Sequence, residues 1–329
     1  MASTCGGDTY HVPVLADQVL ALLSPHPGGR YIDMTLGGGG HTLMMLEASA
    51  PDGHVLGLDR DPAAIASAGA RLAPFGGRAV VARRAFDQVA EVAARHGFVP
   101  ADGILMDVGV SSRQLDDPGR GFSFRADGPL DMRMDPDADI PTAADLVNTL
   151  EFGELARMFR DYGEERHAKR IARAIVRARE DAPFTTTARL AALIEASVPR
   201  ERGPRRIHPA TRVFQALRIA VNDELGMLDR GLDAAFEVLA PGGRLAVISF
   251  HSLEDRMVKQ RFREWSTGCV CPPAFPICQC GRTPLATLLT RRVQVARPEE
   301  VEANPRARSA KLRAVSKQPQ PGAPHEVAR

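Results

Sequence analysis

Short apolar runs alternate with stretches of helical periodicity along most of the chain. The runs predict five strands, and the stretches between them predict helices. The expected strands lie near Tyr31–Met34, His54–Asp59, Ala79–Arg83, Gly103–Asp107 and Leu245–Phe250. The expected helices are His41–Ala48, Pro62–Leu72, Phe86–Arg95 and Leu228–Leu239. Strands that alternate with helices predict an α/β fold in which helices cover both faces of a parallel sheet.

The alternation stops after the fourth predicted strand and resumes shortly before the fifth. The interval begins as a loop, continues with helical patterns and contains no convincing strand. We therefore expect a helical domain, residues 114–207, inserted into a discontinuous core of residues 1–113 and 208–318. The tail, 319–329, is rich in Pro and Gly and is expected to be disordered.

Three of the predicted strands end at or beside an aspartate, namely Asp33, Asp59 and Asp107. Parallel strands place their carboxyl ends on one edge of the sheet, where ligands bind in this architecture. Any one of these residues could instead cap a helix or close a turn. Three of them near a glycine-rich loop favour a binding site.

Four consecutive glycines, Gly37–Gly40, follow the first predicted strand and would let the backbone approach a ligand closely. The dinucleotide fingerprint has glycine at positions one, three and six, but position six counted from Gly37 is Thr42. This departure disfavours an NAD-dependent oxidoreductase and favours a cofactor without phosphates, such as S-adenosylmethionine (SAM). Asp59 would accept both ribose hydroxyls, and Asp33 could face the ammonium group. The alternative is a glycine-rich turn without a ligand.

The bulk composition is that of an ordinary soluble globular protein, with 44% hydrophobic and 25% charged residues among 329. No apolar run approaches the roughly 18 residues that span a bilayer, and no signal peptide is evident. We therefore expect a cytoplasmic protein with reduced cysteines. The net charge is only +2, so affinity for nucleic acid would have to come from local basic patches.

The predicted insert carries two clusters of basic residues. The first recurs at helical spacings of three and four, opposite apolar positions of the same helix. Its members are Arg166, Lys169, Arg170, Arg173 and Arg177. The second cluster comprises Arg200, Arg202, Arg205, Arg206 and His208. Such runs are often only solvated surfaces, but two of them beside a cofactor pocket favour a nucleic-acid substrate.

Polar loops extend the chemistry of the sheet edge. The loop Arg120–Asp135 mixes Arg, Asp, Gly and Met without an obvious packing role, and we expect it to be functional. His251, after the fifth predicted strand, could be an acid or base, or a hydrogen-bonded residue at the strand end.

Two cysteine pairs, Cys269 with Cys271 and Cys278 with Cys280, lie in a proline-rich segment. Four reduced cysteines could bind zinc tetrahedrally, but pairs separated by one residue are not a standard zinc spacing. Zinc binding and four unligated thiols therefore remain equal alternatives, and no metal ligand is assigned. Cys5 stands apart from both pairs.

Several long segments resemble the RsmH (MraW) family of bacterial methyltransferases. They are HVPVL at 11–15, DMTLGGGGH at 33–41, LDRDPAAI at 58–65, DGILMDVGVSSRQLD at 102–116, RGFSFRADGPLDMRMD at 120–135, YGEERHAKRIARAIV at 162–176, HPATRVFQALRIAVNDEL at 208–225, PGGRLAVISFHSLEDRMVK at 241–259 and NPRARSAKLRA at 304–314. The resemblance implies a class I SAM-dependent methyltransferase core, Rossmann-like, with an inserted helical domain. It also implies methylation of N4 of one cytidine, at position 1402, in the 16S rRNA of the small ribosomal subunit.

The resemblance also implies a set of cofactor-binding residues: Gly39, Gly40, His41, Asp59, Phe86, Asp107 and Gln114. Phe86 would stack or pack on the adenine. The chain departs from the family at Met34, where glycine is usual, and at Gln18, where glutamate is frequent. These departures put in doubt the loop's approach to the ligand and any role that needs a carboxylate at position 18.

Asp107 is the expected catalytic residue. A cytosine amino nitrogen is a poor nucleophile because its lone pair is delocalised, and acceptors for its hydrogens localise that pair. Asp107 and the carbonyls of Val108 and Gly109 are the acceptors that the chain offers. The rival interpretations are a ribosome-assembly factor that binds SAM structurally and a methyltransferase of DNA or protein. The expected partner is 16S rRNA within the small subunit and not a membrane, with a homodimer left open.

Overall fold

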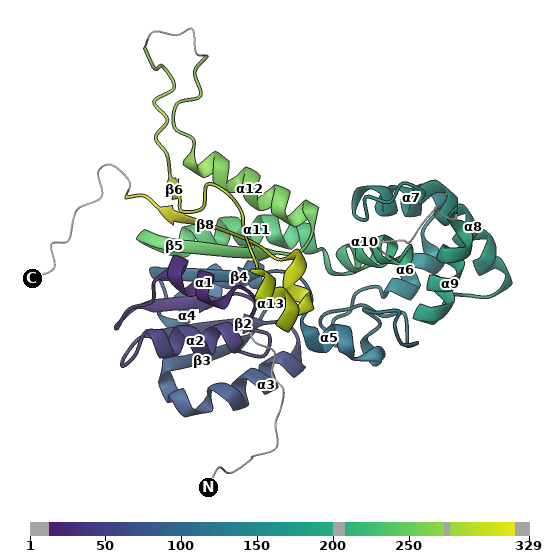
Figure 1. Cartoon of the computed structure of the whole chain (residues 1–329), viewed down its shortest axis with the longest axis horizontal. Helices are drawn as coiled ribbons and strands as arrows, with labels where there is room; N and C mark the ends of the chain where they lie inside the picture. The colour runs from purple at the N-terminus through teal and green to yellow at the C-terminus, as the bar shows by residue number, and fades with distance from the viewer. Residues whose placement is uncertain (1–12, 200–207, 273–276, 320–329) are drawn as a thin grey trace, which may run out of the picture. The chain divides into compact units, whose positions relative to one another are not determined.

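The computed structural model describes residues 13–199, 208–272 and 277–319 of the chain (Figure 1). The chain divides into two compact units. The first joins residues up to Gly109 with those from Met227 onward, and the second is Val110–Gly226.

The first unit is built on one mixed sheet with the strand order β3-β2-β1-β4-β5-β8-β6, and β7 pairs with β8. Its strands are β1 (Arg30–Asp33), β2 (His54–Asp59), β3 (Ala79–Arg83), β4 (Ala101–Asp107), β5 (Leu239–Ser249), β6 (Ala286–Leu288), β7 (Gln294–Val295) and β8 (Lys311–Lys317). Strands β1 to β5 are parallel, and β8 is antiparallel to β5. The five predicted strands are therefore confirmed, with β5 beginning earlier than expected.

Helices cover both faces of this sheet, as predicted. They are α1 (Ala16–Leu23), α2 (Gly40–Ala48), α3 (Pro62–Leu72), α4 (Val89–His96), α11 (Glu224–Val238), α12 (Ser252–Ser266) and α13 (Pro298–Ala303), with short 3-10 turns η1 (Ala73–Arg78), η2 (Phe86–Gln88) and η4 (Pro305–Ser309). Alternate residues of a strand point to opposite faces. Tyr31 of β1 accordingly packs with α1, α2 and α3, whereas Ile32 packs with α4, α11 and α12.

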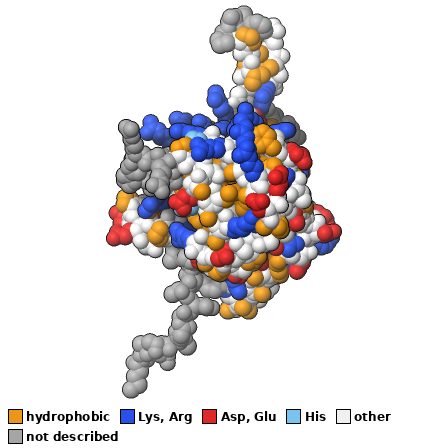
Figure 2. Space-filling model, turned by 90° about the vertical axis from the view of Figure 1, so that its right-hand side faces the viewer, with side chains coloured by type: hydrophobic (Ala, Val, Ile, Leu, Met, Phe, Trp, Pro, Cys, Tyr) orange, Lys and Arg blue, Asp and Glu red, His pale blue; other side chains and the backbone are white. Residues whose placement is uncertain are grey.

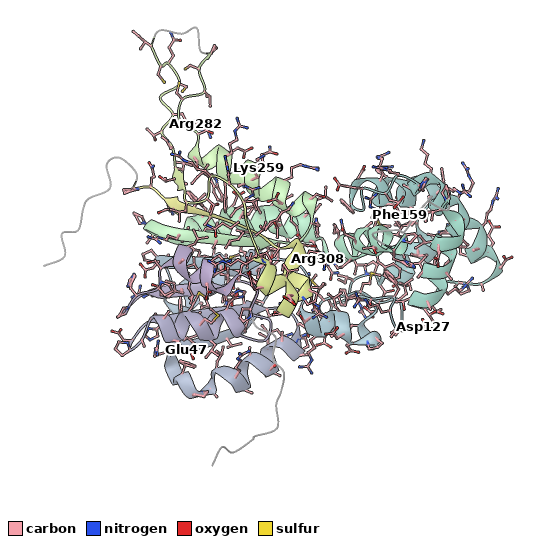
Figure 3. All side chains as sticks on the ribbon, in the orientation of Figure 1. Glu47, Asp127, Phe159, Lys259, Arg282 and Arg308 are labelled. Atoms are coloured by element: carbon pink, nitrogen blue, oxygen red, sulfur yellow. The ribbon has the colours of Figure 1, made fainter. Side chains whose placement is uncertain are left out.

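The second unit is helical. Its elements are α5 (Ser112–Asp116), η3 (Pro118–Arg120), α6 (Ala143–Thr149), α7 (Phe152–Asp161), α8 (Ala168–Asp181), α9 (Thr187–Ser197) and α10 (Ala210–Asn222). Phe159, labelled in Figure 3, is buried in its core. In the described part of this unit, pairing of β type is limited to one bridge between Pro129 and Thr186.

This unit extends beyond the predicted insert, 114–207, at both ends. The reason is packing: Val110 before the insert, and Val213, Phe214 and Leu217 of α10 after it, belong to the unit's apolar core. Apart from its first residue, the predicted tail lies outside the described residues.

The expectation that the loop Arg120–Asp135 has no packing role is wrong. Phe122, Leu130, Met132 and Met134 of this loop are buried in the core of the second unit. Arg120 donates to the carbonyls of Arg133 and Met134 at 3.0 and 2.8 Å. The methionines therefore fill the core, and the arginine donates to main-chain carbonyls of the same loop.

Within the described residues, each helix is too short or too polar to cross a bilayer.

Candidate functional site

Three aspartates meet at one edge of the sheet in the first unit. Asp33, Asp59 and Asp107 are the last residues of β1, β2 and β4. Strand β1 lies between the other two and is parallel to both, so that all three strands end at the same edge. The sequence prediction that these acids share an edge is confirmed.

The glycine loop between β1 and α2 requires residues without side chains. Gly39 caps α2 with a left-handed conformation, φ 76°, which glycine adopts without a steric penalty. A Cβ atom on Gly40 would lie 2.7 Å from Cγ of Pro13. The loop is therefore packed closely against the segment that precedes α1.

Asp59 holds the glycine loop to the end of β2. Its Oδ2 accepts from the amide of Gly37 at 2.9 Å, and its Oδ1 accepts from the amide of Asp61 at 2.9 Å. Burial raises the pKa of Asp59, although these amides and the neighbouring Arg60 oppose the shift. Each carboxylate oxygen retains a second acceptor site, so Asp59 can still take a pair of ribose hydroxyls.

Asp33 has a structural role that its position did not reveal. It is 1% exposed, its Oδ2 accepts from the hydroxyl of Thr42 at 2.8 Å, and its Oδ1 accepts from the amide of Thr35 at 3.2 Å. The buried side chain leaves little surface for an ammonium group, so the structure does not support that expected contact. Thr42, the residue that breaks the dinucleotide fingerprint, is instead the donor that makes this buried acid tolerable.

His41 and Asp107 face each other across the edge of the sheet. Nε2 of His41 lies 3.0 Å from the carbonyl of Val14 and must donate to it, because a carbonyl only accepts. Nδ1 then points toward Oδ2 of Asp107, at 3.8 Å, which is too long for a hydrogen bond. The amide of Asp107 donates to Oγ1 of Thr35 at 2.6 Å and fixes the end of β4.

Asp107 is the most perturbed acid of this edge. Burial raises its pKa to about 6, His41 opposes the shift, and the nearby carboxylates of Asp33 and Glu254 add to it. Its Oδ1 is buried, and no described residue donates a hydrogen bond to it. A buried acceptor without a donor is costly, so Oδ1 disfavours the ionised carboxylate, while the side chain as a whole is 24% exposed and can meet a bound molecule.

His251 is a capping residue at the start of α12. Its Nδ1 accepts from the amide of Glu254 at 3.4 Å, while Glu254 accepts from the amides of Phe250 and His251 at 2.8 and 3.2 Å. Of the two interpretations of His251, the structure favours the hydrogen-bonded residue at the strand end. Sequence reasoning missed the buried Glu254, which a capping pattern with Glu three residues after the cap could have revealed.

The remaining two predicted cofactor residues lie in different units. Phe86 opens η2 after β3 and is half-buried, and a Cβ atom on Gly231 of α11 would lie 2.8 Å from its ring. Gln114 belongs to the second unit, where its Oε1 accepts from the amide of Ser111 at 3.0 Å and caps α5. The glycine loop, His41, Asp59, Phe86 and Asp107 thus belong to the first unit, and Gln114 does not.

Four members of the first basic cluster lie on α8, and the fifth, Arg166, lies just before it. All five are exposed, while Ala168, Ile171, Ala172 and Ile175 of α8 are buried. This confirms the predicted amphipathic helix. Figure 2 shows blue side chains gathered along one edge of the face that it presents. Of the second cluster, His208 is exposed, and its four arginines lie outside the described residues.

Comparison with known proteins places these features in a family. The model of the MraW methylase family matches residues 8–318. A ribosomal RNA small subunit methyltransferase H from Symbiobacterium thermophilum is 56% identical over 94% of this chain and 96% of its own. The protein of the same name from Geobacter sulfurreducens is 56% identical over 93% of this chain and 98% of its own.

Among solved structures, an rRNA methylase from Streptococcus thermophilus covers 92% of this chain and 94% of its own at 9% identity, with a TM-score of 0.40. A similarity of this size adds nothing to the fold described above.

Proposed function

The chain belongs to the MraW methylase family, and on that premise we propose that it methylates the 16S rRNA of the small ribosomal subunit with SAM as methyl donor. The observation that carries this function is 56% identity, over 94% of the chain, with a small-subunit rRNA methyltransferase. The atom that we propose as acceptor is N4 of one specific cytidine.

The residues at the carboxyl edge of the sheet fit this cofactor. Asp59 presents two carboxylate oxygens for the ribose hydroxyls, and Gly39 and Gly40 leave the loop backbone open to close approach. Phe86 offers an apolar ring for the adenine. When bound, SAM supplies an electrophilic methyl group on a sulfonium sulfur.

Asp107 supports the proposed reaction as a hydrogen-bond acceptor. Its carboxylate, whose side chain is 24% exposed, would accept a hydrogen from the cytosine amino group. This interaction localises the nitrogen lone pair and orients it toward the methyl group. The main-chain carbonyls of Val108 and Gly109 are the further acceptors of the proposal.

The proton balance needs no strong base. As the new N–C bond forms, the amino nitrogen becomes acidic and loses one proton to Asp107 or to water. With a pKa of about 6, Asp107 is mostly ionised at pH 7 and can still accept a proton transiently.

The basic face of α8 supports RNA as the substrate. Arg166, Lys169, Arg170, Arg173 and Arg177 are exposed on one side of the second unit, and arginine binds phosphate bidentately. We assign them to the RNA backbone rather than to base recognition, which is the usual division of labour. The target base must leave its stack to reach Asp107.

We also place the protein in the cytoplasm, where its substrate is assembled. The oligomeric state is either monomer or homodimer, and light scattering after size-exclusion chromatography distinguishes them.

The proposal is tested with methyl-labelled SAM and small ribosomal subunits that lack the modification. We expect SAM to bind in calorimetry and label to enter 16S rRNA. Asp107→Ala should lower turnover by about 10²–10³-fold while RNA binding changes little. Comparable single-turnover rates in the variant and the wild type would contradict the role of Asp107. Bound SAM without label in RNA would contradict the reaction.

A further inference from the structure

The described residues of the segment between α12 and β6, 267–272 and 277–285, form no apolar core of their own. None of these residues is buried, and Val270 and Ile277 are 54% and 75% exposed. In Figure 1 this segment extends away from the sheet of the first unit. Ordering the backbone costs about 1–2 kcal/mol per residue, so something other than apolar burial must hold the described parts of the segment.

Main-chain contacts hold the base of this segment. The amide of Leu285 donates to the carbonyl of Trp265 at 2.7 Å, and Arg282 donates to the carbonyl of Glu264 at 2.7 Å. Figure 3 shows Arg282 at this base, beyond the end of α12. These contacts close the two ends of the segment on each other but do not reach the cysteines.

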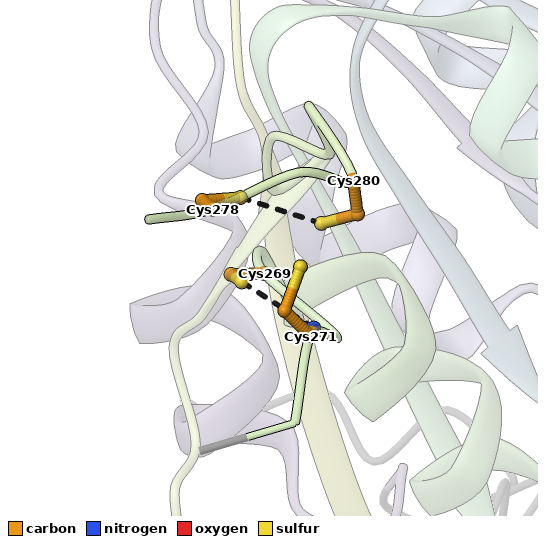
Figure 4. Close-up of side chains that lie close together, drawn as sticks. All are labelled: Cys269, Cys271, Cys278 and Cys280. Atoms are coloured by element: carbon orange, nitrogen blue, oxygen red, sulfur yellow. Dashed lines mark hydrogen bonds between the residues drawn. The ribbon is translucent and has the colours of Figure 1, made fainter. Parts of the chain in front are cut away.

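Four cysteine sulfurs converge farther along the segment (Figure 4). The Sγ atoms of Cys269, Cys271, Cys278 and Cys280 all lie within 4.8 Å of one another. Cys278 and Cys280 are 3.5 Å apart at sulfur, which excludes a disulfide between them in this conformation. A tetrahedral zinc site with Zn–S bonds of about 2.3 Å requires sulfurs about 3.8 Å apart, so small movements of the side chains would complete it.

Main-chain amides point at these sulfurs, as they would at thiolates. The amide of Cys271 lies 3.4 Å from Sγ of Cys269, and that of Gln279 lies 3.3 Å from Sγ of Cys271. Such bonds to the ligand atoms orient and stabilise a metal-bound thiolate.

The four thiols also affect one another because their sulfurs lie so close together. Four thiols this close cannot all ionise without a cation between them, because each thiolate opposes the next. A divalent cation removes this conflict.

We propose that Cys269, Cys271, Cys278 and Cys280 bind one zinc ion and that this ion orders the segment between α12 and β6. The convergence of the four sulfurs favours zinc binding over four unligated thiols, the two alternatives that the unusual spacing left open. Binding converts the thiols to thiolates and releases their protons to solvent. The coordination is closed, with four protein ligands and no open position, so the site is structural rather than catalytic.

Metal analysis of the full-length protein is the first test. The protein is produced in zinc-supplemented medium and purified with a thiol reductant and without chelator. We expect about one zinc per chain and four sulfur ligands at about 2.3 Å in X-ray absorption. Iron in place of zinc would overturn the assignment, as would a substoichiometric zinc content that persists after reconstitution with zinc sulfate and gel filtration.

Paired variants test which thiols bind. Cys278→Ser/Cys280→Ser should lose the zinc, whereas Cys5→Ser, the matched control, should retain it. In the Cys5→Ser protein, a mercurial should release all the zinc after about four equivalents. Circular dichroism should show that both variants keep the folded core, because the described residues of the segment bury nothing.

Limited proteolysis tests the ordering role separately. Cleavage within residues 267–285 should become faster only when zinc is lost. Full zinc content in the double variant, or equal cleavage with and without zinc, would overturn the proposal.

Discussion

At the scale of the residue, the site contains carboxylates that lie close together and are buried, which costs free energy. Asp107 carries a buried oxygen to which no described residue donates, and Asp33 and Glu254 both add negative charge nearby. Strain of this kind is typical of functional sites, because a group left open for a ligand cannot also be satisfied in the ligand-free protein. The role of Asp107 can therefore be tested through the stability of variants as well as through their activity.

Asp107→Asn should stabilise the ligand-free protein at neutral pH while it lowers turnover. The folded pKa of Asp107 is about 6, above the ordinary value of 3.8 for an aspartate, so between these values the folded state binds more protons than the unfolded state. Stability therefore falls as pH rises through this window. We expect the variant to gain about 1–3 kcal/mol at pH 7.5, and the gain should disappear as pH falls toward about 4 in urea unfolding.

The matched control for this prediction is Asp102→Asn, at the opposite end of β4. Asp102 accepts from the amide of Arg30 at 2.8 Å, which an asparagine oxygen can also do. The turnover of the Asp102→Asn variant should stay at the wild-type value. A gain in stability for Asp107→Asn that is independent of pH would contradict the assigned pKa.

Thr42→Val should destabilise the protein although valine has nearly the same shape. The change removes the hydroxyl that donates to Oδ2 of the buried Asp33 at 2.8 Å. We expect a loss of about 1–3 kcal/mol in the free energy of unfolding. Thr42→Ser keeps the donor and should lose less. Equal stability of the valine variant and the wild type in urea unfolding would show that Asp33 does not depend on Thr42.

At the scale of the element, the parallel part of the sheet was predictable and the antiparallel part was not. The apolar runs of β1, β2 and β4 are largely buried, which is the pattern of a sheet covered on both faces, while β3 at the edge of the sheet is half-buried. Strand β8 alternates Lys311, Leu312 and Arg313, and its cations pair with Asp255 of α12 at 3.4 and 2.7 Å. A short alternating stretch with charges has no signal that separates it from a loop.

The parts of the site that could be predicted are likewise those with a signal in the sequence. The position of an acid at a strand end follows from topology, so the common edge of Asp33, Asp59 and Asp107 was predictable. Whether an acid is open to a ligand depends on its donors. The contact between Thr42 and Asp33 joins two elements through a turn and has no periodic signature in the sequence.

Gly231→Ala in α11 should weaken SAM binding without weakening the helix. A Cβ at this position would lie 2.8 Å from the Phe86 ring and would displace it from the proposed adenine site. We expect about a fivefold rise in the dissociation constant, equivalent to about 1 kcal/mol. Gly69→Ala in α3, where nothing lies within 4 Å, is the control. Calorimetry should show an unchanged affinity for SAM in that control. An unchanged affinity for SAM in Gly231→Ala would show that Phe86 does not contact the adenine.

At the scale of the whole molecule, the candidate catalytic residues and the basic cluster belong to different units. The acids and the glycine loop belong to the first unit, whereas the exposed cations of α8 belong to the second. The overall net charge of +2 does not reveal this local cluster of cations. Affinity for RNA should therefore depend on ionic strength through the second unit.

Arg170→Ala/Arg173→Ala on α8 should weaken RNA binding and flatten its dependence on salt. Each phosphate contact that is lost should reduce the slope of log affinity against log salt by about 0.7–0.9. Arg95→Ala in the first unit removes an exposed arginine that pairs with Glu91 at 2.8 Å and should leave the slope unchanged. Identical slopes for the wild type and the double variant would exclude α8 from the RNA contact.

The identity of the methylated nucleoside tests the central claim most directly. Small subunits lacking the modification are incubated with the protein and methyl-labelled SAM, and the 16S rRNA is digested to nucleosides. We predict label in N4-methylcytidine at a single site. Label in another nucleoside, or in ribosomal protein, would contradict the proposed acceptor. An unlabelled digest from protein that still binds SAM would contradict the enzymatic function itself.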